Sequence, residues 1–153
     1  MRVYVPATFA DLETISRGLH EPARGFALTH RMLEISSLDD EEEIAEQVRD
    51  AAAWASVKDL GSPVRVVIVV DHPRADVEEL AGEHPAAVAL QGRIGVAEIA
   101  CAFIDEPDAV ADVRAALDGG DDARESLEAR DLLWWGPGEL ASVPGPDAPS
   151  SGA

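Results

Sequence analysis

Apolar residues recur along the chain in segments whose periods predict strands and helices in turn. The first segment, residues 2–5, consists largely of β-branched and aromatic residues and stops at Pro6, which is typical of a strand. Residues 8–11 have the spacing of a capping box, and apolar side chains then follow at helical intervals up to residue 19. Two short elements come next, a strand over residues 25–29 and a helical turn over residues 30–35.

The longest predicted helix runs over residues 38–59. Ser37 and Asp40 have the spacing of a second capping box, and the acidic run 39–43 places negative charge at the positive end of the helix dipole. Five consecutive side chains cannot converge on one ion, so this run predicts a helix start and not a metal site. Gly61 supplies the stop. Apolar residues at spacings of four, three and four form a stripe that predicts close packing on a sheet: Ile44, Val48, Ala51 and Ala55.

The middle of the chain contains its most apolar segment. Residues 64–70 are nearly continuous in apolar side chains, the pattern of a central strand covered on both faces. Residues 77–80, with a glycine behind them, predict a short helix. Two further strands are predicted over residues 86–90 and 98–104, with a glycine-containing turn between them.

The final third predicts one clear helix and one last strand. Asp105 is placed to cap a helix that has Pro107 in its first turn and stops at Gly119-Gly120. Residues 121–130 are polar and indicate a loop or a loose helix, and residues 131–135 form the last strand-like run.

Strands that alternate with helices predict an α/β or α+β layer structure. We expect a single mixed β-sheet of about five strands with helices packed on one or both faces, and a ferredoxin-like α/β sandwich is the alternative. The chain has the length of one domain, which we assign to residues 1–142. Residues 143–153 are small residues and prolines with little to bury, which predicts a disordered tail.

Charge and cysteine content exclude some partners. Thirty acidic residues against twelve basic ones give a formal net charge of -18, which repels nucleic acid and anionic membrane surfaces. No apolar run approaches the length of a membrane span, and the start of the chain lacks the pattern of a signal peptide, so we expect a cytoplasmic protein. The single cysteine, Cys101, agrees with a reducing compartment, and its apolar neighbours predict a buried, inert thiol.

Standard catalytic motifs are missing from the sequence. It has no phosphate-binding loop, no hydrolase nucleophile elbow and no paired zinc ligands. The sequence therefore predicts no cofactor and no metal. The remaining candidates for a functional site are Asp71 and Asp105, which are singled out by their positions, because each stands where an apolar strand ends. They are either helix caps or, if the two strands are parallel neighbours, ligands of a divalent cation with His72 or Glu106 beside them.

Two of the four histidines precede prolines, which predicts extended and exposed turn positions for His72 and His84. A metal site formed by His30, His72 and His84 has no spacing argument in its favour.

Two adjacent tryptophans stand out in the last predicted strand. Successive side chains of a strand point to opposite faces, so Leu133 and Trp135 share one face while Leu132 and Trp134 share the other. With helices on both faces of the sheet, both tryptophans belong to the core. With helices on one face only, a leucine and a tryptophan form an exposed patch that needs a partner.

Six segments, taken in order, resemble a family of small actinobacterial proteins of unknown function. They are "MRVYVPAT", "FALTHRM", "RDAAAWASV", "RVVIVVD", "DAVADVRAAL" and "DLLWWGPGEL". The resemblance spans most of the chain and agrees with a composition typical of a GC-rich genome, with no asparagine and a single lysine. It implies a cytoplasmic bacterial protein and brings no activity, cofactor or catalytic residue.

Two hypotheses of function follow from these observations. The first is a non-catalytic association or regulatory protein that acts as a homodimer or with a protein partner, through Leu133, Trp134 and Trp135. The alternative is a small-molecule or divalent-metal-dependent enzyme or binder that uses the carboxylates of Asp71 and Asp105.

Overall fold

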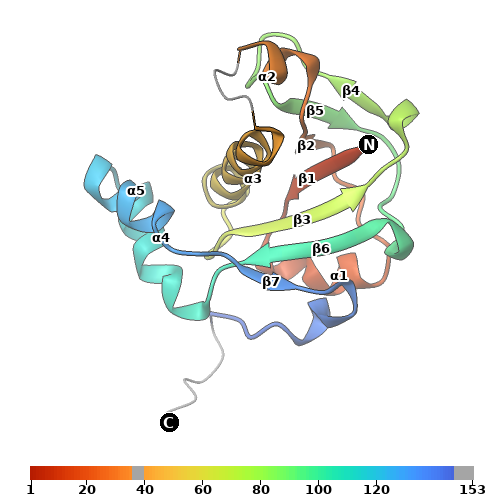
Figure 1. Cartoon of the computed structure of the whole chain (residues 1–153). Helices are drawn as coiled ribbons and strands as arrows, with labels where there is room; N and C mark the ends of the chain where they lie inside the picture. The colour runs from red at the N-terminus through yellow and green to blue at the C-terminus, as the bar shows by residue number, and fades with distance from the viewer. Residues whose placement is uncertain (36–39, 147–153) are drawn as a thin grey trace.

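The computed structural model describes residues 1–35 and 40–146. Its seven strands form one sheet in the order β4-β5-β2-β1-β3-β6-β7, in which every neighbouring pair is antiparallel (Figure 1). The sheet therefore has more strands than predicted and is not mixed. The strands are β1 (Arg2–Pro6), β2 (Arg24–Phe26), β3 (Val66–Asp71), β4 (Val77–Glu79), β5 (Ala87–Leu90), β6 (Ile99–Ile104) and β7 (Leu133–Trp135).

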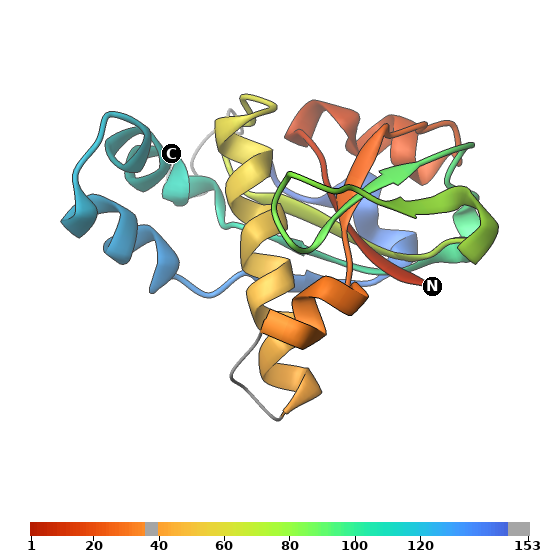
Figure 2. The ribbon, with the colours of Figure 1, turned by 90° about the horizontal axis from the view of Figure 1, so that it is seen from above.

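Helices cover both faces of this sheet. The long helix α3 packs on one face, α1 and the 3-10 helix η5 lie on the other, and the pair α4–α5 sits at one end of the strands (Figures 1 and 2). Within residues 1–35 and 40–146, the elements do not follow the β-α-β-β-α-β order of a ferredoxin-like sandwich. The α-helices are α1 (Leu12–Ser16), α2 (His30–Ile35), α3 (Glu41–Lys58), α4 (Val110–Leu117) and α5 (Asp121–Glu128); the 3-10 helices are η1 (Phe9–Asp11), η2 (Arg74–Asp76), η3 (Val96–Glu98), η4 (Pro107–Ala109) and η5 (Pro137–Ser142).

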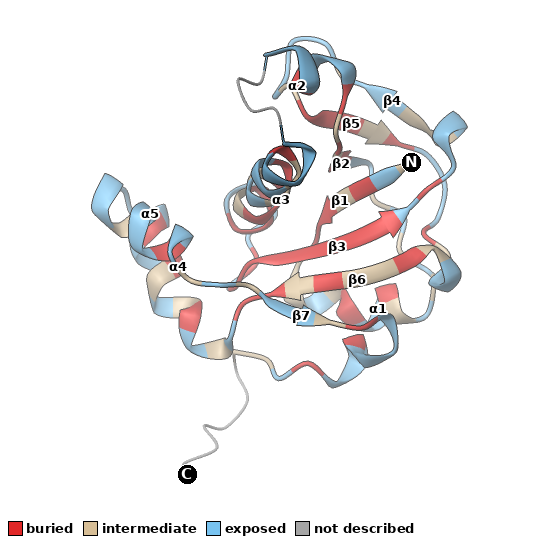
Figure 3. Cartoon of the chain, in the orientation of Figure 1, coloured by how far each residue is buried: buried red, intermediate tan, exposed pale blue. Residues whose placement is uncertain are grey.

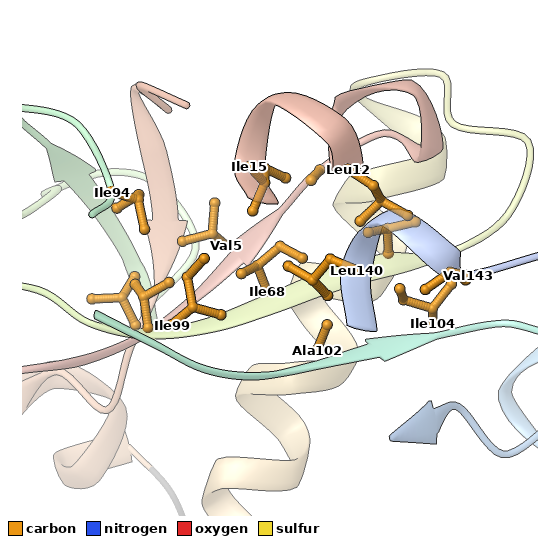
Figure 4. Close-up of a cluster of buried hydrophobic side chains, with 14 of the residues drawn as sticks. Val5, Leu12, Ile15, Ile68, Ile94, Ile99, Ala102, Ile104, Leu140 and Val143 are labelled. Atoms are coloured by element: carbon orange, nitrogen blue, oxygen red, sulfur yellow. The ribbon is translucent and has the colours of Figure 1, made fainter. Parts of the chain in front are cut away.

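The central strand is buried on both faces, as its sequence predicts, since all residues from Val66 to Val70 are buried (Figure 3). Its alternate side chains serve two separate clusters. Ile68 joins the larger cluster, where it packs between the sheet and the helices α1 and η5 (Figure 4). Val67 faces the other way and packs against the small side chains Ala52 and Ala53 of α3.

The long helix begins slightly later than predicted. The Asp40 side chain caps α3 by accepting a hydrogen bond of 2.9 Å from the backbone N–H of Glu42. The predicted capping partner Ser37 lies outside the described residues. Ile44, Val48 and Ala55 are buried as expected.

Residues 77–80 were expected to form a short helix, and this prediction is wrong. Residues 77–79 form the edge strand β4, which pairs with β5 in register Val77↔Leu90. A segment of three residues is too short to show a periodicity that separates a strand from a helix. Its pairing with β5 depends on the hairpin turn around Gly82, whose φ of 83° lies in the left-handed region.

Two predictions concern the last part of the chain. Residues 121–128 form α5, which agrees with the loose helix and not with the loop. Val143, the first residue of the predicted tail, is buried in the larger cluster. The rest of that prediction falls mainly on residues 147–153, which lie outside the described residues.

No helix in the described ranges has both the length and the apolar character needed to cross a membrane.

The contact between β1 and β2 predicts a strict need for glycine at position 25. A methyl group added there would lie 2.6 Å from Cγ1 of Val3 and 3.3 Å from Cδ1 of Leu90, both in the core. We expect Gly25→Ala to lower the free energy of unfolding by about 1–3 kcal/mol, measured by urea denaturation. Gly138→Ala is the matched control, because nothing lies within 4 Å of the added methyl group. Equal stabilities of the two variants would contradict this packing.

Candidate functional site

Asp71 and Asp105 lie at opposite ends of two neighbouring strands. β3 and β6 are antiparallel, with Val66 opposite Ile104, so the end of β3 at Asp71 is far from the end of β6 that precedes Asp105. The parallel arrangement that a shared cation site requires is therefore not present. In the parts of the chain that the structure describes, no group of three or more His, Cys, Asp or Glu side chains could hold a metal ion.

Asp71 forms an exposed ion pair with Arg2 of the adjacent strand. Nε of Arg2 donates to Oδ1 of Asp71 and Nη2 donates to Oδ2, each at 3.2 Å. The hydrogen bonds from Arg2 hold the pKa of the Asp71 carboxyl below its usual range. Because both side chains are more than half exposed, solvent screens the pair and its contribution to stability is small.

Asp105 does not cap a helix and instead forms a buried ion pair with Arg65. Oδ2 of Asp105 accepts from Nε and from the backbone N–H of Arg65, each at 2.9 Å, and Oδ1 accepts from Nη2 at 2.8 Å. Glu106 takes the N-cap position of η4 and is exposed. The Asp105 carboxylate is thus engaged by Arg65, which directly precedes the neighbouring strand β3, and the helix-cap prediction is wrong because this cation binds the carboxylate instead.

The same arginine anchors the start of the last strand. Nη2 of Arg65 also donates to the carbonyl oxygen of Arg130, at 3.2 Å. The Arg130 side chain in turn donates from Nε to Asp112 at 2.6 Å and from Nη1 to Asp108 at 3.1 Å. Glu106 lies near this cluster, with Oε2 3.9 Å from Nη1 of Arg130. These bonds fix the chain where it leaves α5 and enters β7.

His72 was expected in an exposed turn, and this prediction is wrong because the side chain is buried. Its Nδ1 lies 2.9 Å from Oε1 of Glu98, and its Nε2 lies 2.7 Å from the carbonyl oxygen of Gln91. Its ring thus links the end of β3 to η3 and to the loop that precedes it. His84 is exposed as predicted, and its Nδ1 accepts from the N–H of Ala86 at 3.0 Å.

The double tryptophan lies in β7 at the edge of the sheet, and its side chains point to opposite faces. Trp134 pairs with Phe103 of β6 and Trp135 pairs with Ala102. Trp135 is partly buried against the larger cluster, whereas Trp134 is 61% exposed and Leu133 is 39% exposed. One tryptophan therefore contributes to the core and the other does not.

The face that carries Trp134 is only partly covered by this chain. α3 packs on β1, β2 and β3 (Figures 1 and 2). Over β6, α3 places the guanidinium of Arg49 4.9 Å from the centre of the Phe103 ring, and Phe103 also packs against the cluster that contains Ala52 and Ala53. We call Cys101, Phe103 and Trp134 the open face; the first two are half-buried and the third is exposed.

Cys101 is only half-buried, so the prediction of a fully buried thiol is wrong. Burial nevertheless raises the pKa of the Cys101 thiol, and a side-chain hydrogen bond with Trp134 opposes part of that rise. The thiol is thus kept protonated and belongs to the apolar surface around Trp134.

The two edges of the sheet differ in charge. β4 exposes the carboxylates of Glu78 and Glu79, and charged side chains on an edge strand discourage pairing with another chain. β7 contains only Leu133, Trp134 and Trp135 and has no charged side chain. The edge of β7 is therefore the one that is chemically suited to accept another strand.

Comparison with known protein families gives a match over most of the chain. The model of a family of unknown function, DUF6912, matches residues 1–143. No curated protein and no solved structure matches the chain.

The two aspartate pairs predict very different mutational costs. Asp105→Ala leaves the buried guanidinium of Arg65 without its partner, which we expect to cost about 3–5 kcal/mol of unfolding free energy. Asp71→Ala breaks an exposed pair, and we expect it to cost less than about 1 kcal/mol. Chemical denaturation of both variants measures the difference. A similar small cost for both would show that Asp105 is not a structural residue.

Proposed function

We propose that this chain, which belongs to the family of unknown function DUF6912, works by association with protein through the edge of β7 and the open face beside it. The observation that carries the proposal is the exposed indole of Trp134 on an edge strand without charge. The chain acts in a reducing compartment such as the cytoplasm, which its single cysteine supports.

Exposure of this tryptophan is costly unless a partner covers it. A tryptophan buries a large apolar area when it is covered, and tryptophan is enriched among the residues that dominate the energy of protein interfaces. Trp134 also has apolar neighbours across and beside it, Phe103 and Cys101, so the exposed indole is the centre of a patch. Contiguous apolar patches of this kind mark interaction surfaces.

The backbone of β7 adds a second source of affinity. It pairs with β6 on one side, and as the last strand in the order it has no strand of the described residues on the other, so its outward N–H and C=O groups are open to pairing. An added strand satisfies these groups, while the side chains on each face supply specificity. An open edge and an exposed tryptophan on the same three residues therefore favour strand addition over docking of side chains alone.

The placement of the carboxylates gives no support to a metal-dependent enzyme. Asp71 is paired with Arg2, Asp105 is paired with Arg65, and the two pairs lie at opposite ends of their strands. Each acid already has a partner within the fold.

Site-specific photo-crosslinking in the native cells tests this proposal. Replacing Trp134 with the photoreactive residue p-benzoylphenylalanine keeps a large aromatic side chain at the edge. We expect irradiation to give a discrete protein adduct from position 134. The matched control carries the same residue at Leu19, which is 50% exposed and lies outside β7, and should give none. No adduct from position 134, or equal adducts from both positions, would overturn the proposal.

A further inference from the structure

We propose that the occupant of the β7 edge is an extended basic segment of another protein, which adds as a strand and lays a lysine or arginine side chain across the indole of Trp134. This inference rests on the association proposed above and names the chemistry of the partner. Its support lies in the carboxylates around Trp134 and in the cations that cover other aromatic rings of this chain.

Carboxylates without a cationic partner border the open face. Glu42 and Glu46 of α3 lie beside Phe103, around a hollow of about 270 Å³. Asp131 lies just before β7, and all three carboxylates are exposed. None of them forms an ion pair, although the described residues include all twelve lysines and arginines of the chain and its four histidines. The surface around Trp134 therefore offers negative charge to a partner.

Arg49 is the cation that lines this hollow, and it leaves the two glutamates unpaired. Its guanidinium lies 4.9 Å from the centre of the Phe103 ring, and its Nε lies 3.9 Å from Oδ1 of Asp50. One guanidinium stands against the carboxylates of Glu42 and Glu46, so the hollow stays negative. The contact with Phe103 also shows that an aromatic ring of this face accepts a guanidinium as its neighbour.

The indole of Trp134 is open to solvent and carries no cation from its own chain. Trp54 has the guanidinium of Arg124 4.2 Å from its ring centre and the ammonium of Lys58 5.9 Å from it. Trp135 packs against the larger cluster. Trp134 is 61% exposed, and no lysine or arginine of the described residues lies over its ring. Since tryptophan attracts cations more strongly than the other aromatic side chains, its open ring favours a cation from a partner.

Addition of a strand beside β7 brings a cation to this ring. The added strand lies about 4.8 Å from β7, and its residue directly opposite Trp134 points to the same face of the sheet. The long stem of a lysine or arginine there lies along the indole, while the charged head extends toward the carboxylates beside Phe103. The next residue of the added strand points to the other face, where Leu133 is 39% exposed. The matching segment therefore alternates basic and apolar residues.

The charge of the whole chain adds attraction at longer range. A formal net charge of -18 steers a basic segment toward the surface and repels acidic ones, a second copy of this chain included. Because β7 itself has no charged side chain, apolar and backbone contacts hold the segment once it arrives. Added salt screens the attraction, so the complex weakens as ionic strength rises.

Calorimetry with a short synthetic peptide of alternating lysine and valine tests this chemistry on the purified chain. We expect saturable binding, with a dissociation constant that rises with salt concentration. A peptide with glutamate in place of lysine should not bind. A peptide of the same composition with its lysines grouped at one end should bind more weakly, because its charges then point to both faces of the sheet.

Substitutions locate the peptide on the open face. The double variant Glu42→Gln, Glu46→Gln should raise the dissociation constant about three- to tenfold, the effect of losing two exposed ion pairs. The matched control is Glu21→Gln, Glu125→Gln, which changes the net charge equally at exposed positions outside the open face and should have a smaller effect. Trp134→Leu keeps an apolar side chain but removes the cation–π contact, and should raise the constant about two- to fivefold.

The photo-crosslinked adduct at position 134 identifies the occupant in cells. We expect mass spectrometry to place the crosslink in a partner segment that alternates basic and apolar residues. A crosslink to a segment without basic residues, or to a second copy of this chain, overturns the basic partner and leaves the association standing.

Three results with the purified chain also overturn the basic partner. They are failure of the alternating peptide to bind, binding that strengthens with salt, and equal effects of the two double variants. The absence of any adduct at position 134 overturns the association as well.

Discussion

The buried ion pair between Arg65 and Asp105 is the constraint on which the edge of the sheet depends. It joins the start of β3 to the end of β6, and through the carbonyl of Arg130 it also fixes the segment that enters β7. Desolvating two charges is costly, and a pair that is fully hydrogen-bonded offsets that cost only in one geometry. Its contribution is therefore less to total stability than to the placement of β7 beside β6, which decides which side chains remain outside.

Periodicity was sufficient for the strongly patterned parts of this fold. The apolar run 64–70 became the central strand, and the stripe through Ile44 and Val48 became the buried side of α3. The β4 strand was missed because three residues carry no period that distinguishes a strand from a helical turn. Strand direction was beyond the sequence altogether, since antiparallel pairing here depends on long-range contacts between β3, β1 and β6.

The candidate site was predictable where side-chain alternation alone decides the outcome. The opposite orientation of Trp134 and Trp135 follows from strand geometry, and the structure confirms it. The burial and hydrogen bonding of Asp105 and His72 could not be predicted from the sequence, because their partners Arg65 and Glu98 are distant along the chain. A single arginine within an otherwise apolar strand was a usable signal for the first of these, since a buried cation requires a buried acid.

The unequal chemistry of the two sheet edges also limits how large an assembly can grow. Chains that pair through one edge and remain free to pair through the other add without end and form filaments. Here the edge opposite β7 is β4, and Glu78 and Glu79 would set carboxylates against carboxylates if two such edges met. One receptive edge and one repellent edge limit any strand addition to the β7 side, so the acidic β4 strand opposes open-ended growth of the sheet and aggregation.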